Sequence, residues 1–520
     1  MYNKRYYICV ILFAFFTLMG VTACQPTPED LIVQQKNDGE LMEAIQSTAE
    51  PVSEVPSEVA SPEEGLTYKV VDHQSFTEEL VNGITLTADA DIMMPDVAGY
   101  PVVTYRRKVF TQGDVDRILQ VLIDAKPLYQ TYDRVPKTKA QIEEMIVQIN
   151  LDYKDLHAPI AEMKGIKSLV ELHEERDDIL KDLYKMLETA PDTLDLDTHN
   201  KKLGRDGSLQ GFVPFDQTTM MRLQIYNNDN GGRLCYSDIG IKLCVDEVGR
   251  LLDDVRQKST FTSCQCFYDN MLNNLPLIPV TEKVDTMTIT PQEAKDLAET
   301  AFHKVGAGED VRVTQVYYLE IPRKDVQGYL VELKRHIGDV PIEAMASSDA
   351  GKEKRAKDAN GDPFNAGIPY EIMSVYITNE GIVDFCWREP LEVVAVENAN
   401  VSLASTDTVT DVFRQEFTNG WSGKSTDYTQ EIAENDSLIS RTIPTYDLHE
   451  VKLGYGIARK PNQSDVFMAI PLWDFYGTVS QTTVFVDPDG VEQTTSDNHT
   501  SSILTINGID HSRFSRHWGY

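Results

Sequence analysis

The stretch Thr290–Phe302, TPQEAKDLAETAF, predicts the helix from which the fold of this chain can be worked out. Thr290 has the side chain of a helix N-cap, Pro291 suits the first helical position, and Glu293 completes a capping box. Apolar residues then recur at intervals of three and four, which gives the helix one buried stripe: Ala294, Leu297, Ala298, Ala301 and Phe302. Such a helix must pack its stripe against another element.

Strand patterns follow this helix at once. A tight turn at Asn379-Glu380-Gly381 joins the last two strands, and the polar residues between Gly338 and Pro369 are expected to form a mobile loop. The predicted strands are Val311–Leu319, Gly328–His336, Tyr370–Thr378 and Ile382–Arg388. One helix followed by an antiparallel meander is the unit that this part of the sequence indicates.

The same order recurs from Thr406, where a second amphipathic helix begins. Strands are expected after it at Leu448–Ala458, Val466–Phe475, Thr482–Val486 and Ile503–Ile506. The sequence therefore predicts an α+β fold of antiparallel sheets with packed helices. Residues 281–520 would form a C-terminal domain that is a tandem of two helix-plus-meander units.

Residues 66–280 predict a separate N-terminal α+β domain with a helical hairpin. Its strands would be Gly83–Asp91 and Val102–Phe110, and Thr111 would cap a helix. The hairpin would consist of the amphipathic segments Lys137–Tyr153 and Ser168–Thr189. The domain boundary is expected near residue 280.

Residues 1–23 have the layout of a lipoprotein signal peptide. Lys4 and Arg5 precede the apolar run Ile8–Leu18, which is shorter than the roughly 20 residues that span a bilayer. Ala23 would also suit ordinary signal peptidase, and an uncleaved anchor is a third possibility. The cysteine directly after Ala23 favours a lipobox, in which the Cys24 thiol accepts a diacylglycerol and the protein carries palmitate-type chains. The expected location is the extracytoplasmic face of the cell membrane, with Cys24 as the lipid anchor.

Residues 24–65 are expected to form a disordered acidic tether. From Gln25 to Gly65 there are ten acidic residues and one lysine, together with five prolines. Such a composition buries too little apolar surface to fold alone. A short helix around Glu40–Ser47 is the one exception that the pattern allows.

The whole chain carries 82 acidic and 48 basic residues, a net charge of −34. This charge excludes nucleic acid as a partner, because the phosphate backbone would be repelled. The expected partners are the membrane, through the N-terminal lipid, and a protein of the cell envelope.

Four of the seven cysteines lie close together in the sequence and could form two disulfides outside the cytoplasm. They are Cys235, Cys244, Cys264 and Cys266. A bridge between Cys264 and Cys266 would be strained, and three pairings are possible for four cysteines. A zinc site and buried thiols are the alternatives, although no C-x-x-C pair and no nearby histidine support zinc.

Searches for reactive motifs predict no catalytic residue, no metal site and no cofactor. The chain has no G-x-S-x-G elbow, and Gly423-Lys424-Ser425 lacks the glycine that a phosphate loop needs. Asp89 and Asp91 share one strand face and could bind calcium or act as acid and base. With so many acidic residues, a chance pairing is the simpler interpretation.

Several motifs resemble those of known families. Cys24–Glu29, Phe110–Arg117, Ile470–Phe475 and Leu504–Asp510 together resemble a family of uncharacterised lipoproteins from Gram-positive, clostridial-type bacteria. Ile289–Lys334 is similar to a PepSY-type module. The C-terminal half is similar to the extracytoplasmic regulators of a cell-wall sensor kinase, a resemblance that implies function by binding and inhibition.

The sequence therefore predicts a surface-anchored lipoprotein, not an enzyme, with a binding or regulatory role in the cell envelope. One alternative is a hydrolase of cell-wall or peptide substrates built from dispersed residues. Another is a solute-binding lipoprotein, which the absence of a repeated βαβ pattern disfavours.

Overall fold

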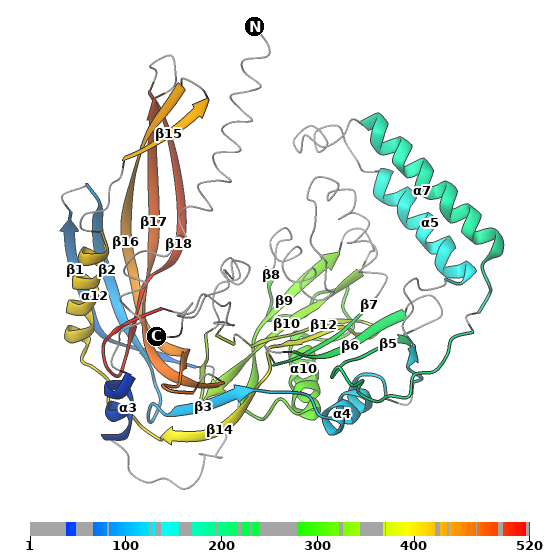
Figure 1. The fold of residues 1–520 in the computed structure, drawn as a ribbon, viewed down its shortest axis with the longest axis horizontal. Coiled ribbons are helices and arrows are strands. Elements are labelled where there is room, and N and C mark those ends of the chain that lie inside the picture. Colours follow the sequence, from blue (N-terminus) through cyan, green and yellow to red (C-terminus); the bar gives the residue numbers. More distant parts are fainter. Residues whose placement is uncertain are drawn as a thin grey trace.

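A computed structural model describes residues 38–47, 66–130, 137–154, 169–238, 278–343, 368–515 and 519. Short gaps fall at 81–82, 125, 194, 216–219, 229–230, 322–325, 370, 422–426, 434–435, 464 and 487–491. The described residues form six helices and nineteen strands, and the strands belong to two large sheets (Figure 1). This confirms the α+β class predicted from the sequence.

The first sheet has nine strands and uses both ends of the described chain. Its strands are β1 (Tyr68–Glu79), β2 (Thr85–Pro95), β3 (Val102–Arg107), β14 (Leu391–Asn398), β15 (Asp427–Ala433), β16 (Asp436–Arg459), β17 (Val466–Val486), β18 (Glu492–Asn507) and β19 (Arg513–Phe514). Pairing is antiparallel except between β2 and β16, which run parallel. Helix α12 (Thr406–Trp421) covers one face, with Phe413 stacked on Phe475 at 4.0 Å between ring centroids.

The second sheet has ten strands, all from the middle of the chain. They are β4 (Tyr129–Gln130), β5 (Leu209–Pro214), β6 (Met220–Asn228), β7 (Gly231–Asp238), β8 (Ile278–Pro279), β9 (Val311–Ile321), β10 (Val326–Ile337), β11 (Val340–Pro341), β12 (Ile372–Thr378) and β13 (Gly381–Arg388). Helices α4 (Gln112–Leu122) and α10 (Pro291–Val305) pack on one face of it around the largest hydrophobic core. Both helices begin with a complete capping box, at Thr111 and at Thr290.

The predicted boundary at residue 280 does not separate two sheets. Strand β7, before this boundary, pairs with β13, after it, so residues 129–388 share one sheet. The nine-stranded sheet joins residues from 68 to 107 with residues from 391 to 514. A boundary placed by a local change in composition misses this arrangement, because the partners of a strand can lie anywhere in the chain.

The tandem predicted for residues 281–520 is corrected in the same way. The unit that begins with α10 lies in the ten-stranded sheet, whereas the unit that begins with α12 lies in the nine-stranded sheet. The helix that packs beside α10 is α4, whose own meander is β5, β6 and β7. Two helix-plus-meander units do share a sheet, but they come from residues 112–388.

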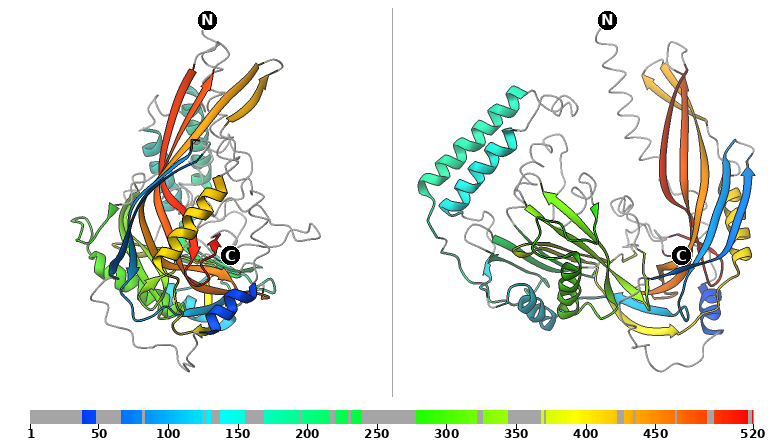
Figure 2. Two further views of the ribbon diagram at one scale, coloured as in Figure 1. Left: turned by 90° about the vertical axis from the view of Figure 1, so that its left-hand side faces the viewer. Right: turned by 180° about the vertical axis from the view of Figure 1, so that it is seen from behind.

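The predicted helical hairpin is confirmed by α5 (Lys139–Lys154) and α7 (Leu169–Thr189) (Figure 2). Ile142, Ile146 and Ile149 of α5 pack against Leu180 and Leu183 of α7. The N–H of Lys139 donates to the carbonyl of Pro191 at 3.0 Å. The start of α5 therefore lies beside the end of α7, and the hairpin is antiparallel.

Part of the predicted tether is folded. Residues Asp38–Ser47 form helix α3, and Ile45 is completely buried against the nine-stranded sheet. The amide of Asn398 donates to the carbonyl of Ile45 at 2.6 Å. This segment folds in spite of its polar composition, because Leu41, Met42 and Ile45 share one side of the helix and pack against the sheet. The other residues between 24 and 65 lie outside the described part of the chain.

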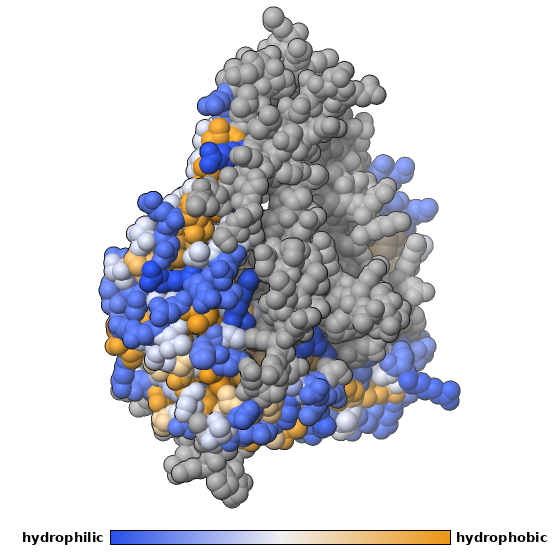
Figure 3. All heavy atoms as spheres, turned by 60° about the vertical axis from the view of Figure 1, so that its left-hand side comes forward, coloured by the Kyte–Doolittle hydropathy of each residue, from blue (hydrophilic) through white to orange (hydrophobic). Residues whose placement is uncertain are grey.

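Hydrophilic residues alternate with small hydrophobic patches on the described surface seen in Figure 3. Within the residues that the structure describes, no helix is long and apolar enough to cross a membrane.

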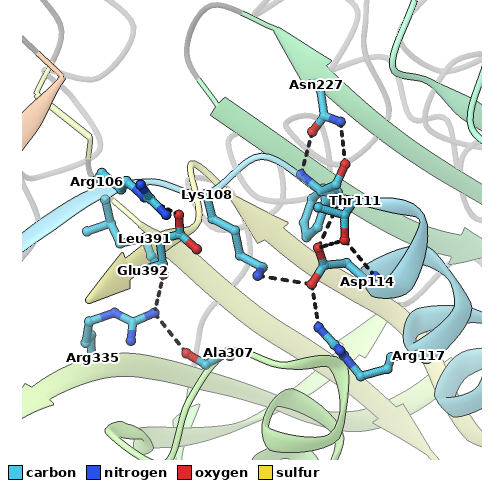
Figure 4. Close-up of polar contacts among 11 residues, drawn as sticks. Arg106, Lys108, Thr111, Asp114, Arg117, Asn227, Ala307, Arg335, Leu391 and Glu392 are labelled. Carbon is cyan, nitrogen blue, oxygen red and sulfur yellow. Dashed lines mark hydrogen bonds and ion pairs between the residues drawn. The ribbon is translucent and has the colours of Figure 1, made fainter. Parts of the chain in front are cut away.

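Within the described residues, the chain passes between the two sheets twice, and the two crossings lie side by side. The N–H of Lys108 donates to the carbonyl of Pro390 at 2.7 Å, and Arg107 pairs with Leu391. A charged network surrounds this junction (Figure 4): Lys108 and Arg117 both contact Asp114, at 3.1 and 2.6 Å. The guanidinium of Arg335 donates to the carbonyl of Ala307, in the loop between α10 and β9, and to the carbonyl of Leu391, the first residue of β14.

Candidate functional site

An arm of four strands projects from the nine-stranded sheet (Figures 1 and 2). It consists of β15, residues 436–447 of β16, residues 478–486 of β17 and residues 492–502 of β18. Strands β16 and β17 are 24 and 21 residues long, whereas strands in globular proteins are usually about 5–6 residues. Their length carries the sheet far beyond the core that supports it.

The foot of the arm lies where the covering elements end. Strand β2 stops pairing with β16 at Thr445, and α12 ends at Trp421, whose ring lies 5.7 Å from that of Tyr446. The pairing of β16 with β17 and the pairing of β17 with β18 are both irregular at this level, at His449 of β16 and at Ile503 of β18. Bulges bend a sheet and increase its twist, so they direct the arm away from the body.

Gly477 permits this bend. A Cβ at this position would lie 2.2 Å from the carbonyl oxygen of Asp447 and 2.9 Å from the side chain of Ile503. No other residue fits that space without a shift of the backbone. The glycine is therefore required by close packing of two strands rather than by its dihedral angles.

In the arm, the described side chains of β18 are polar, and they meet water on both faces of the strand. On β18, Glu492, Gln493 and Thr494 are exposed in succession, and so are Ser496, Asp497 and Asn498. Because neighbouring residues of a strand point to opposite faces, neither face of this strand is covered. The hydroxyls of Thr442 and Thr483 lie 3.0 Å apart across β16 and β17.

The outer edge of β18 is open. Strand β17 pairs with β18 along its whole length, but on the other side β19 pairs only with Thr505 and Ile506. From Glu492 to Leu504 the outer edge has no strand partner among the described residues. This stretch, EQTTSDNHTSSIL, contains neither lysine nor proline, the residues that commonly protect an edge against strand addition.

The strands of the arm are acidic. They carry six carboxylates and one arginine, at Asp427, Glu431, Asp436, Asp447, Glu492, Asp497 and Arg441. A strand edge that no described strand pairs with, and that carries this charge, suits an extended segment with basic side chains.

His449 places an imidazole beside a hydroxyl at the foot of the arm. Its Nε2 lies 2.8 Å from Oγ1 of Thr478. A nucleophile of this kind also needs a group that orients the base. No carboxylate contacts the ring of His449 within the described residues, and the arrangement remains a simple surface contact.

Of the four predicted disulfide cysteines, Cys235 is the one that lies within the described residues. Cys235 lies on β7 directly opposite Cys386 of β13, which was not among the four predicted disulfide cysteines. Both are buried and neither is in a disulfide. Cys24, Cys244, Cys264 and Cys266 lie outside the described residues. A pairing based on nearness in sequence could not anticipate a neighbour from a distant strand.

Asp89 and Asp91 are brought together by a third residue. The ring of His73, on β1, lies 3.1 Å from Asp89 and 2.8 Å from Asp91. The hydrogen bond to Asp91, with the charges of both aspartates, raises the pKa of His73. The three side chains are exposed, and no cluster suited to a metal ion occurs among the described residues.

The sequence predicted only part of the arm. Thr482–Val486 was expected as a separate strand but is the end of β17, and the first half of β18 was missed. Its threonines and serines show no alternation of apolar and polar residues, because neither face is buried. Its content of β-branched threonine is the one signal that could have indicated a strand.

Comparisons with known proteins give no family for this chain. No protein-family model matches it, and no curated protein matches it. Among solved structures, an uncharacterized protein from Eubacterium rectale is similar over 92% of this chain and 99% of its own, with 8% identity and a TM-score of 0.37.

Proposed function

We propose that this protein is a lipid-anchored binding protein of the cell envelope, with no reaction of its own, and that the arm binds an extended segment of another envelope protein. The observation that carries the proposal is the open edge of β18 between Glu492 and Leu504. An edge of this length offers its partner a complete ladder of backbone hydrogen bonds.

Strand addition suits the chemistry of the arm. Main-chain hydrogen bonds provide affinity, and alternate side chains provide specificity. The polar faces of β18 supply hydroxyl, amide and carboxylate groups at every position from Glu492 to Asn498. Since the arm carries six acidic residues against one basic residue, the partner segment is expected to be basic.

The proposed lipid at Cys24 would hold the body close to the membrane. Asp38, at the start of the docked helix α3, is only 14 positions beyond Cys24. A chain extends by at most about 3.5 Å per residue, so this segment reaches roughly 50 Å. Docking of α3 therefore limits how far from the bilayer the arm can search for its partner.

The anchor is tested with Cys24→Ala, which removes the thiol that would accept the lipid. Cells producing this variant are expected to release the protein into the medium, whereas Cys244→Ala leaves it in the membrane fraction. Retention of the Cys24→Ala protein in the membrane would contradict lipid anchoring.

The binding edge is tested by crosslinking in cells, with a photoreactive amino acid in place of Asp497. A proline is then placed at Thr494 in one variant and at Thr495 in another. Neighbouring residues direct their N–H groups to opposite edges of the strand. One proline therefore disrupts the ladder with β17 and lowers the unfolding midpoint, and the other only blocks the open edge.

The edge-blocking variant, identified by its unchanged unfolding midpoint, is expected to lose the crosslink to a basic, extended segment. A proline at exposed Gln481 of β17, which has strands on both sides, serves as a control for general damage to the arm. A crosslink that persists in the edge-blocking variant would rule out strand addition.

A further inference from the structure

Cys235 and Cys386 lie opposite each other near the centre of the ten-stranded sheet, and each is 1% exposed. The two residues contact each other as a small cluster apart from the main cores. Opposed residues of antiparallel strands have Cα atoms about 4.5–5.5 Å apart, within the roughly 4.4–6.8 Å that a disulfide spans. The spacing of such a strand pair is therefore compatible with a disulfide.

The two thiols point away from the core under α4 and α10. Their neighbours Leu234, Tyr236, Phe385 and Trp387 belong to that core, and side chains alternate between faces. On the thiol face, directly opposed residues of five strands make a polar row: Gln224, Cys235, Cys386, Ser374 and Glu332. A row of polar groups buried in a sheet calls for a chemical reason.

The chemical reason that we infer is the buried carboxyl group of Asp384. It lies two residues before Cys386, on the same face of β13, and is 4% exposed. Its Oδ2 has no hydrogen-bond partner among the described residues. Burial raises the pKa of Asp384 well above its ordinary value, and the charge of a Cys235 thiolate raises it further. A carboxyl group in this position can exchange a proton with the thiols.

Other described residues share this face with Asp384. From β12, Tyr376 lies opposite Asp384, and its hydroxyl donates to the carbonyl of Leu319 at 3.0 Å. The register also places four charged side chains on the thiol face, farther from Asp384: Arg222 of β6, Arg233 of β7, Glu332 of β10 and Arg388 of β13.

We propose that Cys235 and Cys386 are a redox-active pair whose disulfide joins β7 to β13, with Asp384 as the group that takes up and returns the thiol proton. The oxidant is an organic disulfide, either a small molecule or one borne by a protein. The Asp384 carboxylate accepts the proton of one thiol, and the thiolate attacks a sulfur of the incoming disulfide.

The thiol–disulfide exchange takes place in two steps, and its protons and electrons balance. The first thiolate forms a mixed disulfide and expels one external thiolate, which takes up the proton held by Asp384. The second cysteine then loses its proton, attacks the mixed disulfide and expels the other external thiolate, which takes up that proton. One S–S bond is broken and one formed, and the two electrons lost by the cysteine pair are gained by the oxidant.

The disulfide would join the two halves of the sheet. Strand β7 ends the first meander and β13 ends the second, and the two cysteines are 151 positions apart in sequence. A crosslink that closes so long a loop restricts the unfolded chain strongly. The redox state of the envelope would thereby control the stability of the ten-stranded sheet.

The bond is tested on the full chain after incubation with oxidised glutathione, alkylation of remaining thiols and peptide mass spectrometry. We expect a Cys235–Cys386 crosslinked peptide that disappears with dithiothreitol, persists in Cys244→Ser and is absent in Cys386→Ser. A Cys235 that is linked to another cysteine, or that stays alkylatable after refolding with oxidised glutathione, would refute the pair.

The role of Asp384 is tested through the rate at which dithiothreitol reduces the bond, expressed per dithiothreitol thiolate and followed against pH. Asp384→Asn is expected to lower the rate by about 100-fold and to abolish its pH dependence. Asp384→Glu, which keeps a carboxyl group, should retain the dependence, and Asp178→Asn, at an exposed position of α7, should match the native protein. A native pH profile in Asp384→Asn would overturn the proton-transfer role.

Discussion

Nε of Arg335 donates to Oε2 of Glu371 at 2.8 Å, and both side chains are buried at the place where the two sheets meet. Glu371 also accepts from the indole of Trp387 and from the backbone N–H of Leu391. Asp310 binds the same guanidinium at 2.7 Å. The charge of Arg335 is thus compensated on two sides, and its pKa is raised by Glu371 and Asp310 despite burial.

Removal of this arginine is expected to destabilise the protein strongly. Arg335→Met would leave Glu371 as an unpaired buried charge, at a cost of about 3–5 kcal/mol. Arg312→Met is the matched control, because its ion pair with Asp339 is partly exposed and such pairs contribute at most about 1 kcal/mol. Urea unfolding followed by tryptophan fluorescence measures the free energy of unfolding of the two variants. Equal effects of the two variants would contradict the structural role of Arg335.

Gly477→Ala is expected to shift or destabilise the foot of the arm. The added Cβ would meet the carbonyl of Asp447 at 2.2 Å, and overpacking of this kind typically costs about 1–3 kcal/mol. Gly420→Ala, in α12, has no atom within 4 Å of its new Cβ and should stabilise slightly, by about 0.5–1 kcal/mol. The unfolding midpoints should move in opposite directions, and a shift of the same sign in both would disprove the close approach at Gly477.

His336 should make stability depend on pH. Burial lowers its pKa to about 4, with a further contribution from the charges of Arg312 and Lys334. A lowered pKa in the folded state means that the unfolded state binds the proton first, so stability is present above about pH 6.5 and is lost as the pH falls toward 4. Between pH 7 and pH 5 this residue alone accounts for a loss of about 2 kcal/mol.

The comparison that isolates this effect is His336→Gln against the native protein, with urea midpoints at pH 7 and pH 5. The native protein should lose more stability than the variant on acidification, and exposed His511→Gln should behave like the native protein. Asp384 acts in the opposite sense, since its raised pKa adds stability as the pH falls. If His336→Gln loses as much stability as the native protein, the histidine is not the group responsible.

Ile45→Ala should release helix α3 from the nine-stranded sheet. Ile45 is completely buried between α3 and residues such as Val401 and Met468, and removal of such a side chain costs about 2–5 kcal/mol. Hydrogen exchange of the α3 amides is expected to accelerate roughly 30-fold or more, while the urea midpoint of the two sheets stays nearly unchanged. Exposed Glu43→Ala should leave the exchange rates as they are, and slow exchange in Ile45→Ala would show that this contact does not hold α3.

The sequence could predict the elements whose stabilising contacts are local. The helices that begin after Thr111 and Thr290 were expected because each follows a threonine that can cap it, and the structure completes each cap with a residue three positions away, Asp114 or Glu293. The alternation in Gly83–Asp91 predicted the strand that the structure shows as β2, because one face of this strand is buried. The helical hairpin was also evident, since its helices are neighbours in sequence and pack mainly on each other.

Only the tertiary structure decided which strands pair and which polar groups meet. The pairing of β7 with β13, the contact of Cys235 with Cys386 and the burial of Arg335 beside Glu371 all join residues that are far apart in the chain or in different elements. Periodicity identifies a strand and its buried face, but backbone hydrogen bonds are the same for any two strands. The choice of partner depends on how whole faces pack, and that information is spread over the entire chain.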